Sequence, residues 1–222
     1  MTEAEWLTCA NPGEMLEALR GKASERKLRL VSGQFCLGYV AAYPHLTWNE
    51  LSSTTLEIAK HASDHGARSD EWTVEPESDS LPSILLHRDA RTAARGTWVA
   101  LTKHIRSELF NRRYSLANFN IEACFGEIEV ATAAFNSAQC ALLRDIFDNP
   151  FRPAVFSPAW RTDTAVSLAR GMYESRDFGA MPILADALQD AGCDSDDVLN
   201  HCRSEGVHVR GCWVVDLLLG KG

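Results

Sequence analysis

Residues with soft metal-binding side chains gather in the last thirty positions of the chain. They are Cys193, His201, Cys202, His208 and Cys212. Zinc prefers four thiolate or imidazole ligands in a tetrahedron, and turns at Gly192 and Gly206 would let the backbone fold around an ion. A structural zinc site formed by Cys193, Cys202, His208 and Cys212 is therefore one interpretation.

The alternative interpretation of the same residues is an ordinary protein core. Cysteine is among the residues most often buried, and no Cys-x2-Cys pair is present. His201 and Cys202 are adjacent, so on a helix they would point in different directions. We expect core cysteines and no resident cofactor, with zinc as the alternative.

A second group of potential ligands is Glu57, His61 and His65, spaced four residues apart. This spacing places all three on one stripe of a helix, where they could bind a metal or act as a general acid and base. The stripe lies largely opposite Trp48, Leu51 and Ile58, which favours a solvated polar face stabilised by side-chain pairs.

The third candidate is Asp216, which lies in a terminal helix that is apolar on nearly every side and includes Trp213. Burial of a carboxylate without a partner is costly, so we expect an ion pair. Arg152, held between Phe151 and Pro153, is the preferred partner and Arg210 the other. The pair would fix the helix structurally, while a catalytic acid with a shifted pKa is the alternative.

No other chemical signature is present in the sequence. It contains no glycine-rich phosphate loop, no Gly-x-Ser-x-Gly elbow and no His-Glu-x-x-His motif, so no catalytic residue is predicted. The net charge of −8 argues against a general nucleic-acid or membrane binder. The basic clusters at residues 20–29 and 103–113 are expected to be solvated helix faces.

The composition also bears on the compartment. The N-terminus is acidic where a secretory signal would be basic, and no apolar run approaches the roughly 20 residues of a membrane span. Seven cysteines, an odd number without a regular framework, are typical of reduced thiols. We expect a cytoplasmic protein.

The hydrophobic spacing is helical nearly throughout the 222 residues. It predicts an all-α, irregular multi-helix bundle of about eight helices. Thr2 with Glu5, Asn11 with Pro12, Ser24 and Thr47 are expected to begin the first four. Long helices at 83–114 and 120–147 follow an acidic loop at 66–83, which is expected to be open to proteases.

The stretch from Asn149 to Pro153 predicts a rigid extended joint, because its two prolines exclude a helix. A C-terminal cluster of short helices should follow at 164–178, 182–191, 195–203 and 211–219. Two regions are therefore expected, at 1–148 and 149–222, although they could form one continuous domain.

Both ends of the chain contain short distinctive blocks, which together cover about half of the chain. They are Thr2–Cys9, Met15–Leu16, Leu19–Ser24, Lys27–Leu30, Leu143–Phe147, Asn149–Pro153, Pro158–Trp160, Pro182–Leu188, Asp190–Cys193, His201–Arg203 and His208–Lys221. These blocks resemble a large uncharacterised family of paralogous bacterial proteins. The resemblance implies no activity. Residues 31–140 depart from the family pattern, including Gln34-Phe-Cys-Leu37 where a Cys-Cys-Arg-Arg run is usual.

These observations favour a non-catalytic helical module that binds another protein, because shared ends around a variable middle suit a common scaffold that presents different surfaces. Groove binding by amphipathic helices is the expected mode. The alternatives are a metal-dependent enzyme that uses Glu57, His61 and His65, and a binding module stabilised by structural zinc. The identity of the partner and the oligomeric state are not predicted.

Overall fold

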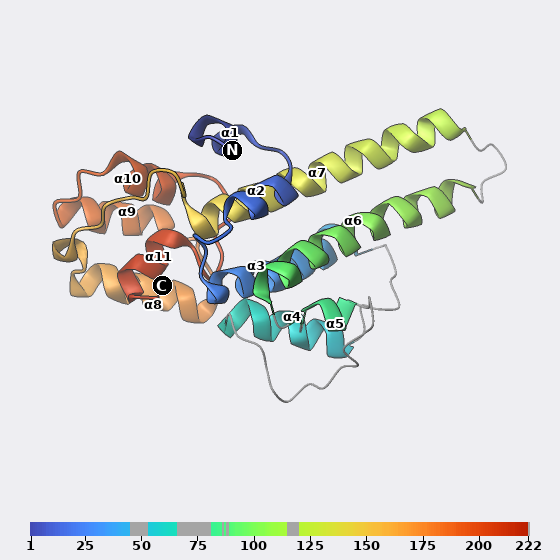
Figure 1. Ribbon diagram of the computed structural model, residues 1–222. Coiled ribbons are helices and arrows are strands. Elements are labelled where there is room, and N and C mark those ends of the chain that lie inside the picture. Colours follow the sequence, from blue (N-terminus) through green and yellow to red (C-terminus); the bar gives the residue numbers. More distant parts are fainter. Residues whose placement is uncertain (45–52, 66–80, 86, 88, 115–119, 222) are drawn as a thin grey trace. The chain divides into compact units, whose positions relative to one another are not determined.

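The computed structural model describes residues 1–44, 53–65, 81–85, 87, 89–114 and 120–221 (Figure 1). These residues form the α-helices α1 to α11 and one short 3-10 helix, and none of them lies in a strand. The predicted all-α fold, with long central helices and short C-terminal ones, is confirmed. The expected helix cap at Thr47 and residues 66–80 of the acidic loop lie outside the described residues.

The chain divides into two compact units. One comprises Met1–Leu7 together with Ala141–Gly222, and the other comprises Thr8–Cys140. The division falls inside helix α7 (Ile121–Phe147), whereas the sequence placed a boundary after residue 148. The N-terminal helix α1 (Glu3–Thr8) contributes its first five residues to the unit that contains the C-terminus, which the sequence did not predict.

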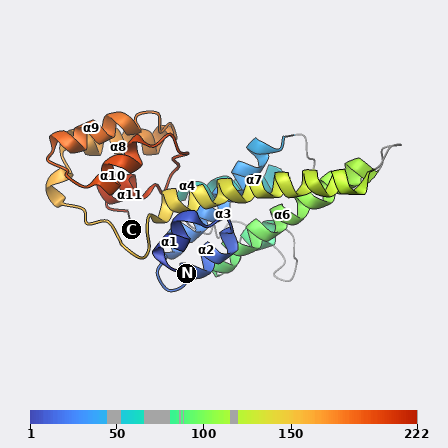
Figure 2. The same cartoon turned by 90° about the horizontal axis from the view of Figure 1, so that it is seen from above.

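The unit formed by residues 8–140 is built around α3 (Glu25–Ala42). This helix packs against α4 (Ser53–His65) and α6 (Ala90–Tyr114), while α2 (Pro12–Ala18) and α5 (Leu81–Leu85) pack on α6 (Figures 1 and 2). The first part of α7 joins through aromatic contacts, with the Phe135 ring edge-on to Tyr39 at 6.2 Å. The core includes Phe35, Tyr39, Ile58, Leu101, Ile105 and Phe135.

Two predicted helix starts in this unit are confirmed. The Asn11 side chain accepts a hydrogen bond from the backbone N–H of Gly13 at 3.0 Å, and Pro12 occupies the first turn of α2. The Ser24 hydroxyl accepts from the N–H of Lys27 at 3.3 Å and begins α3. Each cap satisfies a backbone donor that has no partner inside its helix.

The predicted long helix at 83–114 is wrong, because the structure divides it into α5 and α6. The Asp89 carboxylate accepts from the N–H of Thr92 at 2.7 Å and from its hydroxyl at 2.6 Å. A short acceptor in this position competes with helical continuation and caps a new helix. A new helix therefore begins directly after Asp89.

The second unit contains α1, the end of α7 and the short C-terminal helices. These are the 3-10 helix η1 (Pro158–Trp160), α8 (Asp163–Ser175), α9 (Met181–Asp190), α10 (Asp196–Arg203) and α11 (Trp213–Leu219). Their buried faces form one core, which includes Trp160, Met172, Leu184, Leu188, Val198, Val214 and Leu218. The predicted capping box of α1 is confirmed, because Thr2 and Glu5 exchange backbone-to-side-chain hydrogen bonds.

Two helix starts in this unit differ from the prediction. Thr162 rather than Asp163 caps α8, since its hydroxyl accepts from the N–H of Ala165. Helix α11 begins at Trp213, two residues later than predicted, because Gly211 has a φ of 98°.

In the described part of the chain, no helix has both the length and the apolar character needed to cross a membrane.

The close approach of α3 and α4 gives the first testable prediction. A Cβ atom on Gly33 would lie 2.4 Å from the Ala59 carbonyl oxygen and 2.5 Å from the Ser63 nitrogen. Because both neighbours are backbone atoms, Gly33→Ala must move one helix and should lower the free energy of unfolding by about 1–3 kcal/mol. Urea denaturation measures the change.

The matched control is Gly126→Ala in α7, where a Cβ would meet no atom within 4 Å. This exposed helical site should gain about 0.5–1 kcal/mol, because alanine loses less backbone entropy on folding. Equal stability of Gly33→Ala and the parent protein would contradict the described packing of α3 on α4.

Candidate functional site

The most unusual polar residue of the C-terminal core is Asp145, in the last turn of α7. Its side chain is only 4% exposed. One carboxylate oxygen, Oδ1, lies 2.7 Å from His208 Nδ1 and 3.3 Å from His201 Nε2. The other oxygen accepts a hydrogen bond from the backbone N–H of Val209 at 3.0 Å. The carboxylate is thus surrounded by residues that follow it by more than fifty positions.

Cys212 completes a compact group with these side chains. Its Sγ atom lies 3.2 Å from His201 Nε2, and the potential ligand atoms of Asp145, His201, His208 and Cys212 all lie within 4.8 Å of one another. Cys212 is fully buried, and the side chains of His201 and His208 are 16% and 6% exposed. We call these four residues the Asp-His-His-Cys group.

Local backbone structure explains how these residues meet. His201 lies in the last turn of α10, and an irregular segment then carries His208 to Asp145. The positive φ of Gly211 turns the chain so that Cys212 directly precedes α11. The His201 ring packs against those of His208 and Trp213, at centroid distances of 4.9 and 5.0 Å.

Burial and hydrogen bonding set the protonation states of the group. Burial raises the pKa of Asp145, but hydrogen bonds from His201 and His208 lower it by more, so it lies below its usual value and the carboxylate is charged. Burial and the nearby Asp145 charge raise the pKa of the Cys212 thiol well above its usual value. With no ion bound, Cys212 is therefore a protonated thiol at neutral pH.

The geometry does not fit a Cys-His-Asp catalytic relay. In such a relay the histidine contacts the nucleophile through one ring nitrogen and the orienting carboxylate through the other. Here His201 Nε2 faces both Asp145 and Cys212, and the thiol is buried and protonated. The four potential donor atoms lie within 4.8 Å of one another, so these residues could hold a metal ion.

The structure brings together only part of the predicted zinc site. His208 and Cys212 belong to the Asp-His-His-Cys group, whereas Cys193 and Cys202 are buried in the surrounding core and are not among its members. Sequence reasoning did not single out Asp145. A weak signal was available, because Asp145 stands with Arg144 between the apolar pairs Leu142-Leu143 and Ile146-Phe147.

The Glu57, His61 and His65 stripe lies on α4. The exposed Glu57 carboxylate pairs with Lys60 at 3.0 Å, and His61 is half-buried. This pairing is the kind expected on a solvated helix face. The His65 side chain lies outside the described residues, so a metal site on this stripe stays a prediction.

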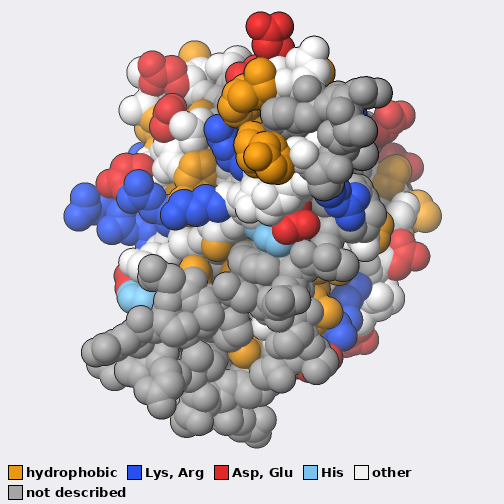
Figure 3. All heavy atoms as spheres, turned by 90° about the vertical axis from the view of Figure 1, so that its right-hand side faces the viewer, with side chains coloured by type: hydrophobic (Ala, Val, Ile, Leu, Met, Phe, Trp, Pro, Cys, Tyr) orange, Lys and Arg blue, Asp and Glu red, His pale blue; other side chains and the backbone are white. Residues whose placement is uncertain are grey.

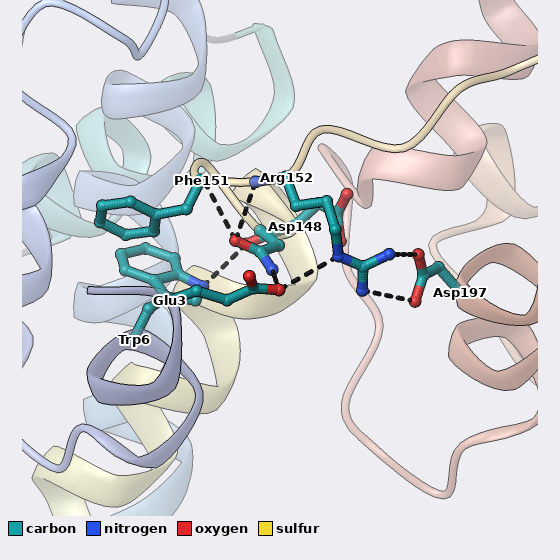
Figure 4. Close-up of polar contacts among 7 residues, drawn as sticks. Glu3, Trp6, Asp148, Phe151, Arg152 and Asp197 are labelled. Carbon is teal, nitrogen blue, oxygen red and sulfur yellow. Dashed lines mark hydrogen bonds and ion pairs between the residues drawn. The ribbon is translucent and has the colours of Figure 1, made fainter.

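Asp216 is buried, as predicted, with 1% of its surface exposed, and Trp213 beside it is also buried. The predicted pairing with Arg152 is wrong. The Arg152 guanidinium donates to both carboxylate oxygens of Asp197, at 2.7 and 3.1 Å, and to Glu3 at 3.1 Å (Figure 4). Two surface carboxylates bind it where it remains hydrated, which avoids the cost of burying a cation.

The other expected partner of Asp216, Arg210, donates to the backbone carbonyls of Tyr173 and Glu174 at 2.6 and 3.2 Å. Its guanidinium also lies 5.1 Å from the centroid of the Tyr173 ring. The backbone carbonyl of Asp216 accepts from the N–H of Lys221 at 2.8 Å, which closes the C-terminal end of α11.

Side-chain hydrogen bonds fix the joint after α7 (Figure 4). The Asn149 side-chain oxygen accepts from the N–H groups of Phe151 and Arg152, and its amide nitrogen donates to Glu3 at 2.6 Å. The Trp6 indole N–H donates to the Asp148 carbonyl at 2.9 Å. A pocket of about 240 Å³ opens beside this joint and reaches His201.

No protein-family model, curated protein or solved structure matches the chain. The resemblance to a paralogous bacterial family therefore stays a prediction. Asp145, His201, His208 and Cys212 all fall inside the blocks that carry the resemblance, so a relative that shares those blocks is expected to share the group.

Thiol reactivity tests the described burial of the cysteines. Only Cys9 is partly exposed, and burial raises the pKa of Cys36 and of Cys202 to about 12. Because the thiolate is the reactive form, one thiol of the seven should react rapidly with a disulfide reagent in the native protein, and the others only after unfolding. Cys9→Ser should abolish the rapid phase. Several rapid thiols in native protein would contradict the packing described.

Proposed function

We propose that the protein is a non-catalytic helical module that binds an amphipathic helix of another protein along the outer face of α7. The observation that carries this proposal is the composition of that face. It consists of the exposed small and apolar residues Ala123, Gly126, Val130, Ala133, Ala134, Ser137 and Ala138. Exposed helix faces are normally rich in charged side chains, whereas the charged residue on this stripe, Glu127, is paired with Arg113, so the face is unusually poor in charge.

The exposure and the charges of this outer face indicate what kind of partner helix it would bind. Val130 is 72% exposed and lies near the middle of the face. Glu122 and Glu129 are exposed along one margin, whereas Glu127 lies on the face, one turn from Ala123, and pairs with Arg113. The small residues would let a partner backbone approach closely, and the acidic margin would favour a partner with basic residues beside its apolar stripe.

Further apolar surface lies where α6 ends and α7 begins. Figure 3 views this end and shows hydrophobic side chains gathered there. Tyr114, Ile121 and Phe125 are 68%, 51% and 48% exposed, and Phe110 stacks on Tyr114 with centroids 5.9 Å apart. Aromatic residues of this kind are frequent anchors in protein interfaces, which adds to the case for a binding surface.

The two alternative functions receive different support. A metal-dependent enzyme that uses Glu57, His61 and His65 gains none, because Glu57 is engaged with Lys60. A binding module that also contains structural zinc is favoured by the Asp-His-His-Cys group, and it is compatible with binding through α7. The proposed interaction does not depend on the metal.

Photocrosslinking in the native cell tests the proposed surface. A photoreactive amino acid at Ala134 of the full-length chain should cross-link to a segment of another protein that has apolar residues spaced three and four apart with lysine or arginine beside them. Adding Val130→Glu should reduce the product at least about tenfold, because it places an unpaired charge in the contact. Mass spectrometry of the cross-linked peptide identifies the segment.

The control carries the photoreactive residue at Ile183 of α9, which is 59% exposed and lies in the other unit. It should not give the same product. Three results would contradict the proposal: no product at Ala134, an identical product at Ile183, or a product in which the captured peptide comes from a second copy of this chain.

A further inference from the structure

We propose that Asp145, His201, His208 and Cys212 bind one Zn²⁺ ion that holds the C-terminal unit together. No activity or partner assigned above requires this site, and it is independent of the outer face of α7. The four side chains come from α7, α10, the segment after α10 and the residue before α11. A single ion would therefore link four parts of the unit that are separated in sequence (Figure 1).

Two of the distances within the group are close to those of a compact tetrahedral site, and all four potential ligand atoms lie within 4.8 Å of one another, so small shifts would bring them around one ion. Zinc bonds of about 2.0–2.1 Å to nitrogen or oxygen and 2.3 Å to sulfur imply separations between ligand atoms of roughly 3.3–3.6 Å. The structure has 3.3 Å between Asp145 Oδ1 and His201 Nε2, and 3.2 Å between His201 Nε2 and Cys212 Sγ. The 2.7 Å between Asp145 and His208 Nδ1 would lengthen slightly around an ion.

Hydrogen bonds among these four side chains cannot all form at the same time. His201 Nε2 can carry only one hydrogen or one lone pair, yet it faces both Asp145 and Cys212. His208 faces the centre of the group through Nδ1, whereas its Nε2 is buried without a hydrogen-bond partner and would stay so with an ion bound. An ion at the centre would use one lone pair from each of the four residues at once.

The charges of the group also favour a divalent cation. Within the described residues, no lysine or arginine pairs with the buried Asp145 carboxylate. On binding, the Cys212 thiol would release its proton to solvent and form the Zn–S bond as a thiolate. Two neutral histidines, one carboxylate and one thiolate would then neutralise Zn²⁺, so the buried centre would have no net charge.

The identities of the donor atoms favour zinc over Mg²⁺ and Ca²⁺. Mg²⁺ and Ca²⁺ require sets of oxygen ligands, whereas this group offers two imidazole nitrogens, one sulfur and one carboxylate oxygen. Zinc accepts all three types in a tetrahedron. Because protein side chains fill all four positions, no place remains for substrate or water, and the ion would be structural.

The surroundings supply the support and the entry path that such a site needs. The Val209 N–H holds Asp145 Oδ2, which orients the other oxygen toward the ligands. The pocket beside the joint is lined by Trp6, His201 and Trp213, so the partly exposed edge of His201 is reached from solvent. An ion could therefore enter without unfolding of the unit.

Metal titration of the purified full-length chain tests the proposal. Protein stripped with a chelator is titrated with Zn²⁺ by calorimetry in two buffers of different ionisation enthalpy, and with Co²⁺ by absorption spectroscopy. We expect one ion per chain, proton release from Cys212, a thiolate-to-cobalt charge-transfer band and a higher melting temperature with metal. The absence of stoichiometric binding, or a cobalt spectrum without sulfur ligation, would overturn the proposal.

Two variants locate the site. Cys212→Ser should remove the charge-transfer band, and Asp145→Asn, which keeps the side-chain shape, should weaken Zn²⁺ binding at least about tenfold. Cys202→Ser is the matched control, because Cys202 is a buried thiol of the same core outside the group. It should keep both the stoichiometry and the band. A band that survives Cys212→Ser, or disappears in Cys202→Ser, would contradict this set of ligands.

Discussion

The arrangement of the C-terminal unit depends on the burial of one carboxylate. Asp145 lies in the last turn of α7 with 4% of its side chain exposed, and its charge must be compensated inside the core. His201, His208 and the Val209 N–H provide this compensation. These groups follow Asp145 by more than fifty residues. Their hydrogen bonds to the carboxylate therefore hold the segment between α10 and α11 against the end of α7.

The end of α7 is also where the N-terminus of the chain is attached. The Arg144 guanidinium donates to the Trp6 carbonyl at 2.9 Å, and the Trp6 indole donates to the Asp148 carbonyl. Asp148 has a φ of 54°, which ends the helix, and Asn149 then orders the joint through its side chain. Backbone groups that the helix end leaves unpaired are thus satisfied by distant parts of the same unit.

The sequence predicted the features that depend on local chemistry. The all-α class, the caps at Asn11 and Ser24 and the burial of Asp216 follow from side-chain type and spacing, and all are confirmed. The residues with which each charged side chain pairs were not predictable, because pairing depends on distances between segments that are far apart in the sequence. Arg152 binds Asp197 and Glu3 instead of Asp216 for this reason. The same applies to the Asp-His-His-Cys group, whose carboxylate comes from a helix remote from the cysteine-rich end.

The small size of the C-terminal unit gives a physical reason for a structural ion. The unit of Met1–Leu7 and Ala141–Gly222 has about 90 residues, and a domain of that size buries only roughly 60–70% of its unfolded surface. An ion that joins these segments would add stability where the apolar core is small, because its four ligands come together only in the folded unit and its binding free energy therefore favours folding. With every coordination position filled by protein, such an ion would perform no chemistry. A site of this kind is compatible with the proposed binding role of the outer face of α7, because the two lie in different units and use different residues.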